Sequence, residues 1–381
     1  MSQENPTYEA ARIVAPKVEE HFAEHHGRAV TRGELDLAPQ PDATAIQAVV
    51  DASFWASFRR EEGQFPKISL AYVAPEQVIQ PLLFETRFDL LTSVLTKLAP
   101  AVERPGVHLG VWQYEGRLQI WGALRSLPSL CFVLEVVEPG LLVVKHRRID
   151  GFGKFANVAI LKGEQIKIVD ENGTSLPDCP ELLKSLLAFT LTDNEDPSVN
   201  VLIQLAASMR AHGHGGSLLV VPDGKEDWRN SIVHPLQYSV KPPYTALADP
   251  LRQDIQDRDE NRWVNAVRKA VETIAGLTAV DGATIVNQNY EVLGFGGKIR
   301  RPEGSPPVER IVATEPIVGN EPIIIHPVQN GGTRHLSAAQ FVQDQKDSLA
   351  LVASQDGRFT IFAWSPCEEM VHAHRVDALL M

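Results

Sequence analysis

Ile274-Ala-Gly-Leu-Thr-Ala-Val-Asp-Gly-Ala-Thr-Ile285 is the stretch that indicates the fold of this chain most clearly. It ends an amphipathic segment, Asn261–Leu277, that carries four apolar residues at helical spacing: Val264, Val267, Val271 and Ile274. Asp281 and Gly282 are turn-forming residues, and Ala283–Val286 is a continuous apolar run suited to a buried strand. The stretch therefore predicts a helix that turns directly into the core of a sheet.

Helices and buried strands alternate on both sides of this stretch, which is typical of an α/β domain over residues 195–381. Helices are expected at Ser198–Ala211 and from Arg334 onward. Strands are expected at Ser217–Val221, Val292–Gly294, Leu349–Ala353 and Phe359–Trp364. Residues 222–256 and 300–332 contain several prolines and are expected to be long loops.

The first half of the chain has a different texture and predicts an α+β region. Residues 1–100 are expected to be mainly helical, with helices over Tyr8–His25 (interrupted at Pro16), Ala43–Glu62 (stopped by Gly63) and Leu82–Leu98, and one short strand at Ile68–Ala74. Residues 105–180 favour an antiparallel β region of three hairpins, over residues 111–121, 131–145 and 158–169. A further helix is expected over Glu181–Leu191. No cluster of acids, histidines or glycines in this half matches a catalytic pattern, so we expect an accessory role for it.

The composition narrows the class of protein. The 381 residues include 36 Lys and Arg and 48 Asp and Glu, so the net charge is 36 − 48 = −12, which disfavours binding to duplex nucleic acid. No apolar run approaches the roughly 20 residues of a membrane helix, and the N-terminus lacks the features of a signal peptide. Three scattered cysteines, Cys131, Cys179 and Cys367, fit a reducing compartment. The sequence predicts a cytoplasmic protein without a membrane partner.

The segment Gly331-Gly-Thr-Arg-His-Leu-Ser-Ala-Ala339 has the residues of an anion site. Thr333 is expected to be the N-cap of a helix, whose first N–H groups and dipole favour a phosphate. Arg334 adds a guanidinium fork. Arg334 and a protonated His335 oppose the helix dipole, so their presence in the first turn hints at a bound anion.

Three other patterns are weaker. Gly294-Phe-Gly-Gly-Lys298 fails as a phosphate loop because Val292 and Ile299 replace the required Gly and Ser or Thr, and it fails as a dinucleotide fingerprint at Ile299 as well. The pairs His212/His214 and His372/His374 each lack nearby third and fourth zinc ligands. Ordinary turn or surface roles explain both pairs better than zinc does.

Taken together, Asp281-Gly-Ala283 on a strand and Gly332-Thr-Arg-His335 opening a helix about fifty residues later resemble the diadenylate cyclase domain. Gly215–Val221 is similar to the first core strand of that family, and Leu349–Ile361 to its closing strands, with Ser354 at the turn between them. The resemblance covers about residues 195–365 and implies a mixed-sheet α/β domain. His212-Gly-His-Gly-Gly216 and the Gly-Phe-Gly-Gly-Lys298 segment look most like DACNV, a divergent branch described as a probable sensor domain.

The resemblance implies an adenine-nucleotide site for ATP or cyclic di-AMP. Asp281 and His335 would be catalytic, and Asp281 would also bind Mg²⁺ or Mn²⁺. The nucleotide would be held by Gly282, Ala283, Gly332, Thr333, Arg334, His335, Ser337 and Ser354. Because two ATP molecules must meet, the resemblance also implies a homo-oligomer with facing sites.

The chain departs from the cyclase pattern where the cyclases usually carry Arg-His-Arg, since Leu336 replaces the second Arg. It also has Ser354-Gln-Asp356 where several cyclases have Ser-Glu-Glu, and its loop over residues 300–332 is longer. Two functions therefore stay open at this point. The chain either condenses two ATP into cyclic di-AMP and pyrophosphate, or it senses a nucleotide with little or no catalysis and signals through its N-terminal half.

Overall fold

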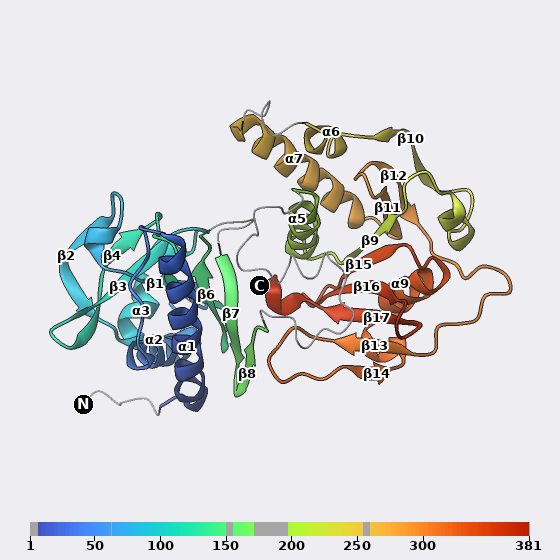
Figure 1. The fold of residues 1–381 in the computed structure, drawn as a ribbon. Helices are drawn as coiled ribbons and strands as arrows, with labels where there is room; N and C mark the ends of the chain where they lie inside the picture. The colour runs from blue at the N-terminus through green and yellow to red at the C-terminus, as the bar shows by residue number, and fades with distance from the viewer. Residues whose placement is uncertain (1–6, 62, 150–154, 171–196, 254–259, 381) are drawn as a thin grey trace. The chain divides into compact units, whose positions relative to one another are not determined.

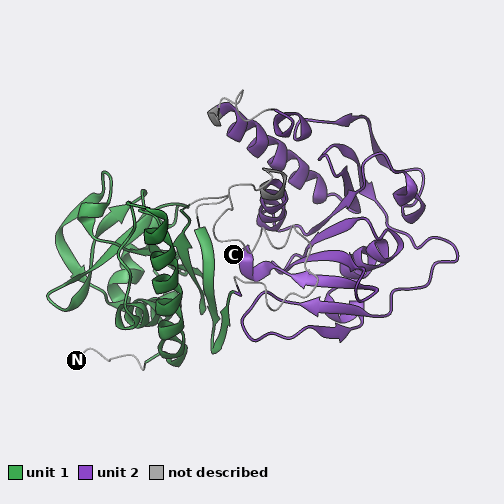
Figure 2. Ribbon diagram, in the orientation of Figure 1, with its two compact units in different colours: residues 1–169, 381 green, residues 170–380 purple. Residues whose placement is uncertain are grey.

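The computed structural model describes residues 7–61, 63–149, 155–170, 197–253 and 260–380. These residues form two compact units, unit 1 within residues 1–169 and unit 2 within residues 170–380 (Figure 2). Both units combine helices with a mixed β-sheet (Figure 1), so the predicted α/β class is confirmed. The helix expected at Glu181–Leu191 lies outside the described residues.

Unit 1 contains a sheet of eight described strands in the order β2-β4-β3-β1-β5-β6-β7-β8. Its helices are α1 (Glu9–Arg32), α2 (Ala43–Ser57), η1 (Pro75–Gln77), α3 (Thr92–Leu98) and η2 (Ala99–Val102). Its strands are β1 (Ile68–Tyr72), β2 (Leu82–Asp89), β3 (His108–Tyr114), β4 (Arg117–Leu124), β5 (Phe132–Glu138), β6 (Leu141–Arg147), β7 (Phe155–Lys162) and β8 (Gln165–Ile168).

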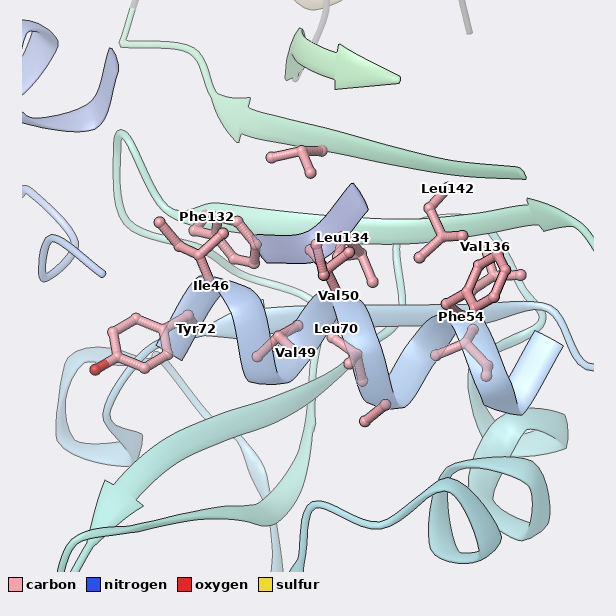
Figure 3. Packing of buried hydrophobic residues seen from close by; sticks show 14 of the residues in the cluster. Ile46, Val49, Val50, Phe54, Leu70, Tyr72, Phe132, Leu134, Val136 and Leu142 are labelled. Carbon is pink, nitrogen blue, oxygen red and sulfur yellow. The ribbon is translucent and has the colours of Figure 1, made fainter. Parts of the chain in front are cut away.

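The core of unit 1 lies between the first two helices and one face of this sheet. Ile46, Val50 and Phe54 project from α2 toward Leu134 and Val136 of β5 (Figure 3). The three predicted hairpins are present as β3–β4, β5–β6 and β7–β8. β1 pairs parallel with β3 and antiparallel with β5, so the region expected to be mainly helical contributes strands to the same sheet as the β-rich region.

Several expected elements of unit 1 are corrected by the structure. Residues 82–89 form strand β2 and only Thr92–Leu98 is helical, because pairing with β4 overrides the helical spacing of the apolar residues. α1 runs through Pro16 without interruption. α2 ends at Ser57, with Phe58 as its C-cap, and therefore stops before the expected end at Gly63.

Unit 2 contains a sheet of nine described strands in the order β10-β12-β11-β9-β15-β16-β17-β13-β14. Its helices are α5 (Pro197–Ala211), η3 (Asp227–Ser231), α6 (Ala248–Leu251), α7 (Glu260–Thr278), α8 (Pro327–Asn330), α9 (Thr333–Asp344) and η5 (Asp377–Leu379). Its strands are β9 (Gly216–Val221), β10 (Tyr238–Tyr244), β11 (Ala283–Asn287), β12 (Val292–Gly297), β13 (Ile311–Thr314), β14 (Ile323–Ile325), β15 (Leu349–Ala353), β16 (Phe359–Ser365) and β17 (Met370–Arg375).

Helices cover both faces of the unit 2 sheet, which explains why β9 is apolar along its length. Leu218 and Val220 pack under α5 and α7, whereas Leu219 and Val221 pack under α9. The expected helices and strands of this half are present, but the two expected long loops are not structureless. Residues 222–256 contain η3, β10 and α6, and residues 300–332 contain β13, β14 and α8.

Candidate functional site

A cavity of about 440 Å³ lies at one edge of the unit 2 sheet. All the site residues named from the sequence line it: Asp281, Gly282, Ala283, Gly332, Thr333, Arg334, His335, Ser337 and Ser354. They come from three segments of the chain. The structure thus brings the Asp-Gly-Ala turn and the Gly-Thr-Arg-His turn together around one space.

The pairing of three central strands explains this meeting. β9 and β11 are parallel, with Ser217 opposite Ala283, so both strands begin at the same edge of the sheet. β15 runs antiparallel to β9, with Ala353 opposite Gly216, so β15 ends at that edge. Asp281 precedes β11 and Ser354 follows β15, which places both residues at the cavity.

Gly282 is required by the close approach of two chain segments. Its φ of 105° is unfavourable for residues with a side chain, and a Cβ there would lie 2.5 Å from the carbonyl carbon of Gly296. The backbone of β12 therefore lies directly against the turn that presents Asp281. This contact fixes one wall of the cavity.

The first turn of α9 forms a second wall. Gly332 is the N-cap and has no side chain to accept a hydrogen bond from the helix, so the expectation that Thr333 caps the helix is wrong. Thr333 is instead the first helical residue. The His335 N–H already donates to the Gly332 carbonyl over 3.0 Å, whereas the N–H groups of Thr333 and Arg334 have no partner within the helix. Backbone donors at the cavity are therefore available to an anion.

His335 differs from the charged residue that the sequence predicts. Its side chain is only 3% exposed, and burial lowers its pKa to about 4. The ring packs against Gly331, where a Cβ would lie 2.4 Å from His335 Nδ1, and its Nε2 has no hydrogen-bond partner among the described residues. His335 is therefore neutral at pH 7 and does not oppose the helix dipole.

Because His335 is neutral, the charge of the cavity is set by two cationic side chains and one carboxylate. Arg334, Lys298 and Asp281 are exposed, and none of them has an ion-pair partner within the described part of the chain. The Arg334 guanidinium lies over Gly215, with Nη1 3.1 Å from the place where a Cβ would stand. The free charges at the cavity therefore sum to +1, which suits an anionic ligand.

Sequence reasoning missed Lys298 and Ser217, which also line the cavity. Lys298 belongs to the Gly-Phe-Gly-Gly-Lys segment that fails as a phosphate loop, and pairing of Gly297 with Ala283 brings it to Asp281. Ser217 is an ordinary strand residue without a chemical signature. Only the strand register could have found either one.

Ser354 is at the cavity but is already engaged in its own turn. Its hydroxyl donates to the Asp356 carboxylate, and this bond lowers the pKa of Asp356. Its backbone N–H donates to the carbonyl of Arg358 over 2.9 Å. Ser354 therefore helps to shape the β15–β16 turn beneath the cavity.

The histidine pairs lie elsewhere. His372 and His374, expected at the surface, are buried in β17, where His374 Nδ1 lies 2.8 Å from Thr314 Oγ1 and His372 Nε2 lies 3.1 Å from Glu368. This strand was not expected from the sequence. His212 and His214 lie at the end of α5. Among the described residues, no three His, Cys, Asp or Glu side chains gather as a metal cluster.

Comparison with known proteins gives one match. Residues 35–125 are similar to a family described as probable sensor domain DACNV. This segment runs from before α2 to the end of β4 in unit 1, so the expectation that residues 212–216 and 294–298 carry the likeness to this branch is corrected. No protein of curated function matches the chain. Within the described residues, no helix has the length and apolar character needed to cross a bilayer.

Proposed function

We propose that unit 2 binds an adenine nucleotide, ATP or cyclic di-AMP, and that the chain acts as a sensor of it. The observation that carries this proposal is the meeting of all the named site residues around one cavity. The match of residues 35–125 to a probable sensor domain supports the sensor role independently.

The phosphates of the nucleotide would lie at the first turn of α9. Unpaired N–H groups of a helix start donate to phosphate oxygens, and the helix dipole favours their negative charge. Arg334 would add a bidentate contact from one side. Lys298 would neutralise a second phosphate as a point charge from the end of β12.

Asp281 would hold the divalent cation. Mg²⁺ is usually bound by one or two carboxylates together with substrate phosphates and water, so a single free carboxylate beside a phosphate site is sufficient. Asp281 is exposed at the cavity and has no partner among the described residues. Mn²⁺ would be bound by the same oxygen ligands.

Two features favour sensing over condensation of two ATP molecules. Leu336 packs with the apolar cluster under α9 and supplies no charge where the cyclases carry Arg. His335 is neutral and buried, so it adds no positive charge for a pyrophosphate leaving group. Condensation would also require a homodimer with two facing cavities. We therefore expect nucleotide binding with little or no turnover, and a signal passed to unit 1.

The test is calorimetric titration of the full chain with ATP and with cyclic di-AMP, each with Mg²⁺ or Mn²⁺. Binding of either nucleotide with one site per chain is expected. Chromatography of the ATP mixture after prolonged incubation measures cyclic di-AMP. Substantial product would replace the sensor by the cyclase, and the absence of any binding would overturn the nucleotide proposal.

Arg334→Ala is expected to weaken nucleotide binding about tenfold or more, because a hydrogen bond to a charged group contributes about 1.5–3 kcal/mol. The melting temperature without ligand should barely move, since Arg334 is exposed and has no ion-pair partner among the described residues. Titrations and melting curves of both proteins measure these effects. Arg310→Ala, at an exposed position away from the cavity, is the control. Equal affinities for wild type and R334A would show that this turn is only a helix start.

Lys298→Gln is expected to weaken ATP more than AMP, because the Lys298 ammonium would contact a phosphate beyond the first. A loss of about fivefold for ATP corresponds to about 1 kcal/mol, the scale of a partly exposed ion pair. The same titrations with ATP and AMP provide the comparison. Lys269→Gln removes one exposed charge from α7 and should change neither affinity. A parallel loss for both nucleotides in K298Q would place Lys298 away from the distal phosphates.

A further inference from the structure

A second cavity, of about 540 Å³, lies in unit 1. It is lined by residues of β1 and β5, by the segment that precedes β3 and by Phe155, and it falls partly within the residues that match the probable sensor domain. Its volume is within the roughly 300–1,000 Å³ of small-molecule sites. The nucleotide site proposed for unit 2 shares no residue with it.

The floor of this cavity is polar and built on paired strands. Ser69 of β1 is directly opposite Glu135 of β5, so both side chains point to the same face. Ser69 Oγ lies 2.7 Å from Nδ1 of the buried His108, and Glu135 accepts from Lys145 Nζ over 2.5 Å. Lys145 is only 8% exposed. Buried polar groups cost stability unless they are paired, and these pairs satisfy them at the cavity floor.

The walls are largely apolar, and the rim carries positive charge. Val137 and Phe155 line one side. β1 and β3 are parallel, so the segments that lead into them start from the same end of the sheet. Lys67 directly precedes β1, and Arg104 lies a few residues before β3. Apolar walls with a few placed polar groups are the usual construction of a small-molecule site.

The charges indicate the class of ligand. Lys67 and Arg104 are exposed and have no ion-pair partner in the part of the chain that the structure describes. The neighbouring Glu103 is the one opposing rim charge among the lining residues, because the charge of Glu135 is balanced by Lys145. We infer that this cavity binds a small organic anion, with an apolar body against Val137 and Phe155 and a carboxylate or sulfonate at Lys67 and Arg104.

The test uses two fluorescent probes that share an aromatic body. 8-Anilinonaphthalene-1-sulfonate carries one negative charge, and N-phenyl-1-naphthylamine is the same body without it. The full chain should bind the sulfonate more tightly than the amine. Lys67→Gln and Arg104→Gln should each weaken the sulfonate about tenfold and leave the amine unchanged. Val137→Trp, at a wall position that is 38% exposed and so tolerates a larger side chain, should weaken both probes.

Lys17→Gln, which removes an exposed charge from α1 at a position that does not line the cavity, is the matched control and should bind both probes as wild type does. Any binding of the probes to unit 2 contributes equally in every variant, because all substitutions are in unit 1. Unchanged sulfonate affinity in K67Q, R104Q and V137W would overturn the inference. Equal losses for both probes in K67Q and R104Q would overturn the anionic class.

Discussion

Gly282→Ala is expected to destabilise unit 2 by about 2–5 kcal/mol. About 1–2 kcal/mol comes from placing a side chain on left-handed backbone, and about 1–3 kcal/mol from overpacking, because the new Cβ would lie 2.5 Å from the Gly296 carbonyl carbon. Neither the Gly296 backbone nor the strand that carries it can move without breaking β11–β12 pairing. Chemical denaturation followed by circular dichroism measures the change.

Gly224→Ala is the matched control for this prediction. Gly224 also has a positive φ, 68°, but nothing lies within 4 Å of its Cβ position. It should therefore show the conformational cost alone, and the difference between the two variants gives the steric contribution. If G282A and G224A lose the same free energy of unfolding relative to wild type, the close contact between the Asp281 turn and β12 does not exist in solution.

The second large effect concerns the pH dependence of stability. His335 has a pKa of about 4 in the folded chain because it is buried, against an ordinary value of 6.5. Above pH 6.5 it is neutral in both states and costs nothing. Between pH 6.5 and 4 the unfolded state binds a proton that the folded state does not, so the free energy of unfolding should fall by roughly 3 kcal/mol across this window.

His335→Leu isolates this contribution because it removes the titrating group and keeps an apolar side chain in the buried position. Denaturation at pH 7 and pH 4.5 should show a smaller loss of stability in H335L than in wild type. His234→Leu, at an exposed histidine of the same unit, should keep the wild-type pH dependence. The same loss in all three proteins would mean that His335 is accessible to water.

The sequence predicts those elements whose residues carry one clear periodicity. α7, β9 and β11 are predictable because their apolar residues follow the helical or the buried-strand pattern. The sequence of β2 predicts a helix instead, because most of its residues are exposed and the spacing of its large apolar residues suits a helix. β13 and β14 are strands of three or four residues in a proline-containing segment, too short for any period to appear.

Some residues of the candidate site can be predicted from local sequence, and others cannot. Asp281 and Arg334 stand in short motifs with turn and helix-start chemistry, and such motifs can be read locally. Lys298 and Ser217 reach the cavity through strand register, a property of pairs of segments rather than of either segment. The neutral state of His335 comes from packing around the ring, which no local pattern contains.

The strand order β11-β9-β15 has a consequence for the chain during its synthesis. β9 and β11 can pair as soon as both have left the ribosome, but the edge that carries Ser354 exists only after β15 has joined them. A nascent chain that ends before Leu349 would present Asp281 and Arg334 on an unfinished scaffold. A ligand that binds only the completed cavity would stabilise the finished sheet and not its precursors. Recognition at this cavity therefore depends on a strand that is made more than a hundred residues after β9, and the cavity cannot be complete before that strand has paired.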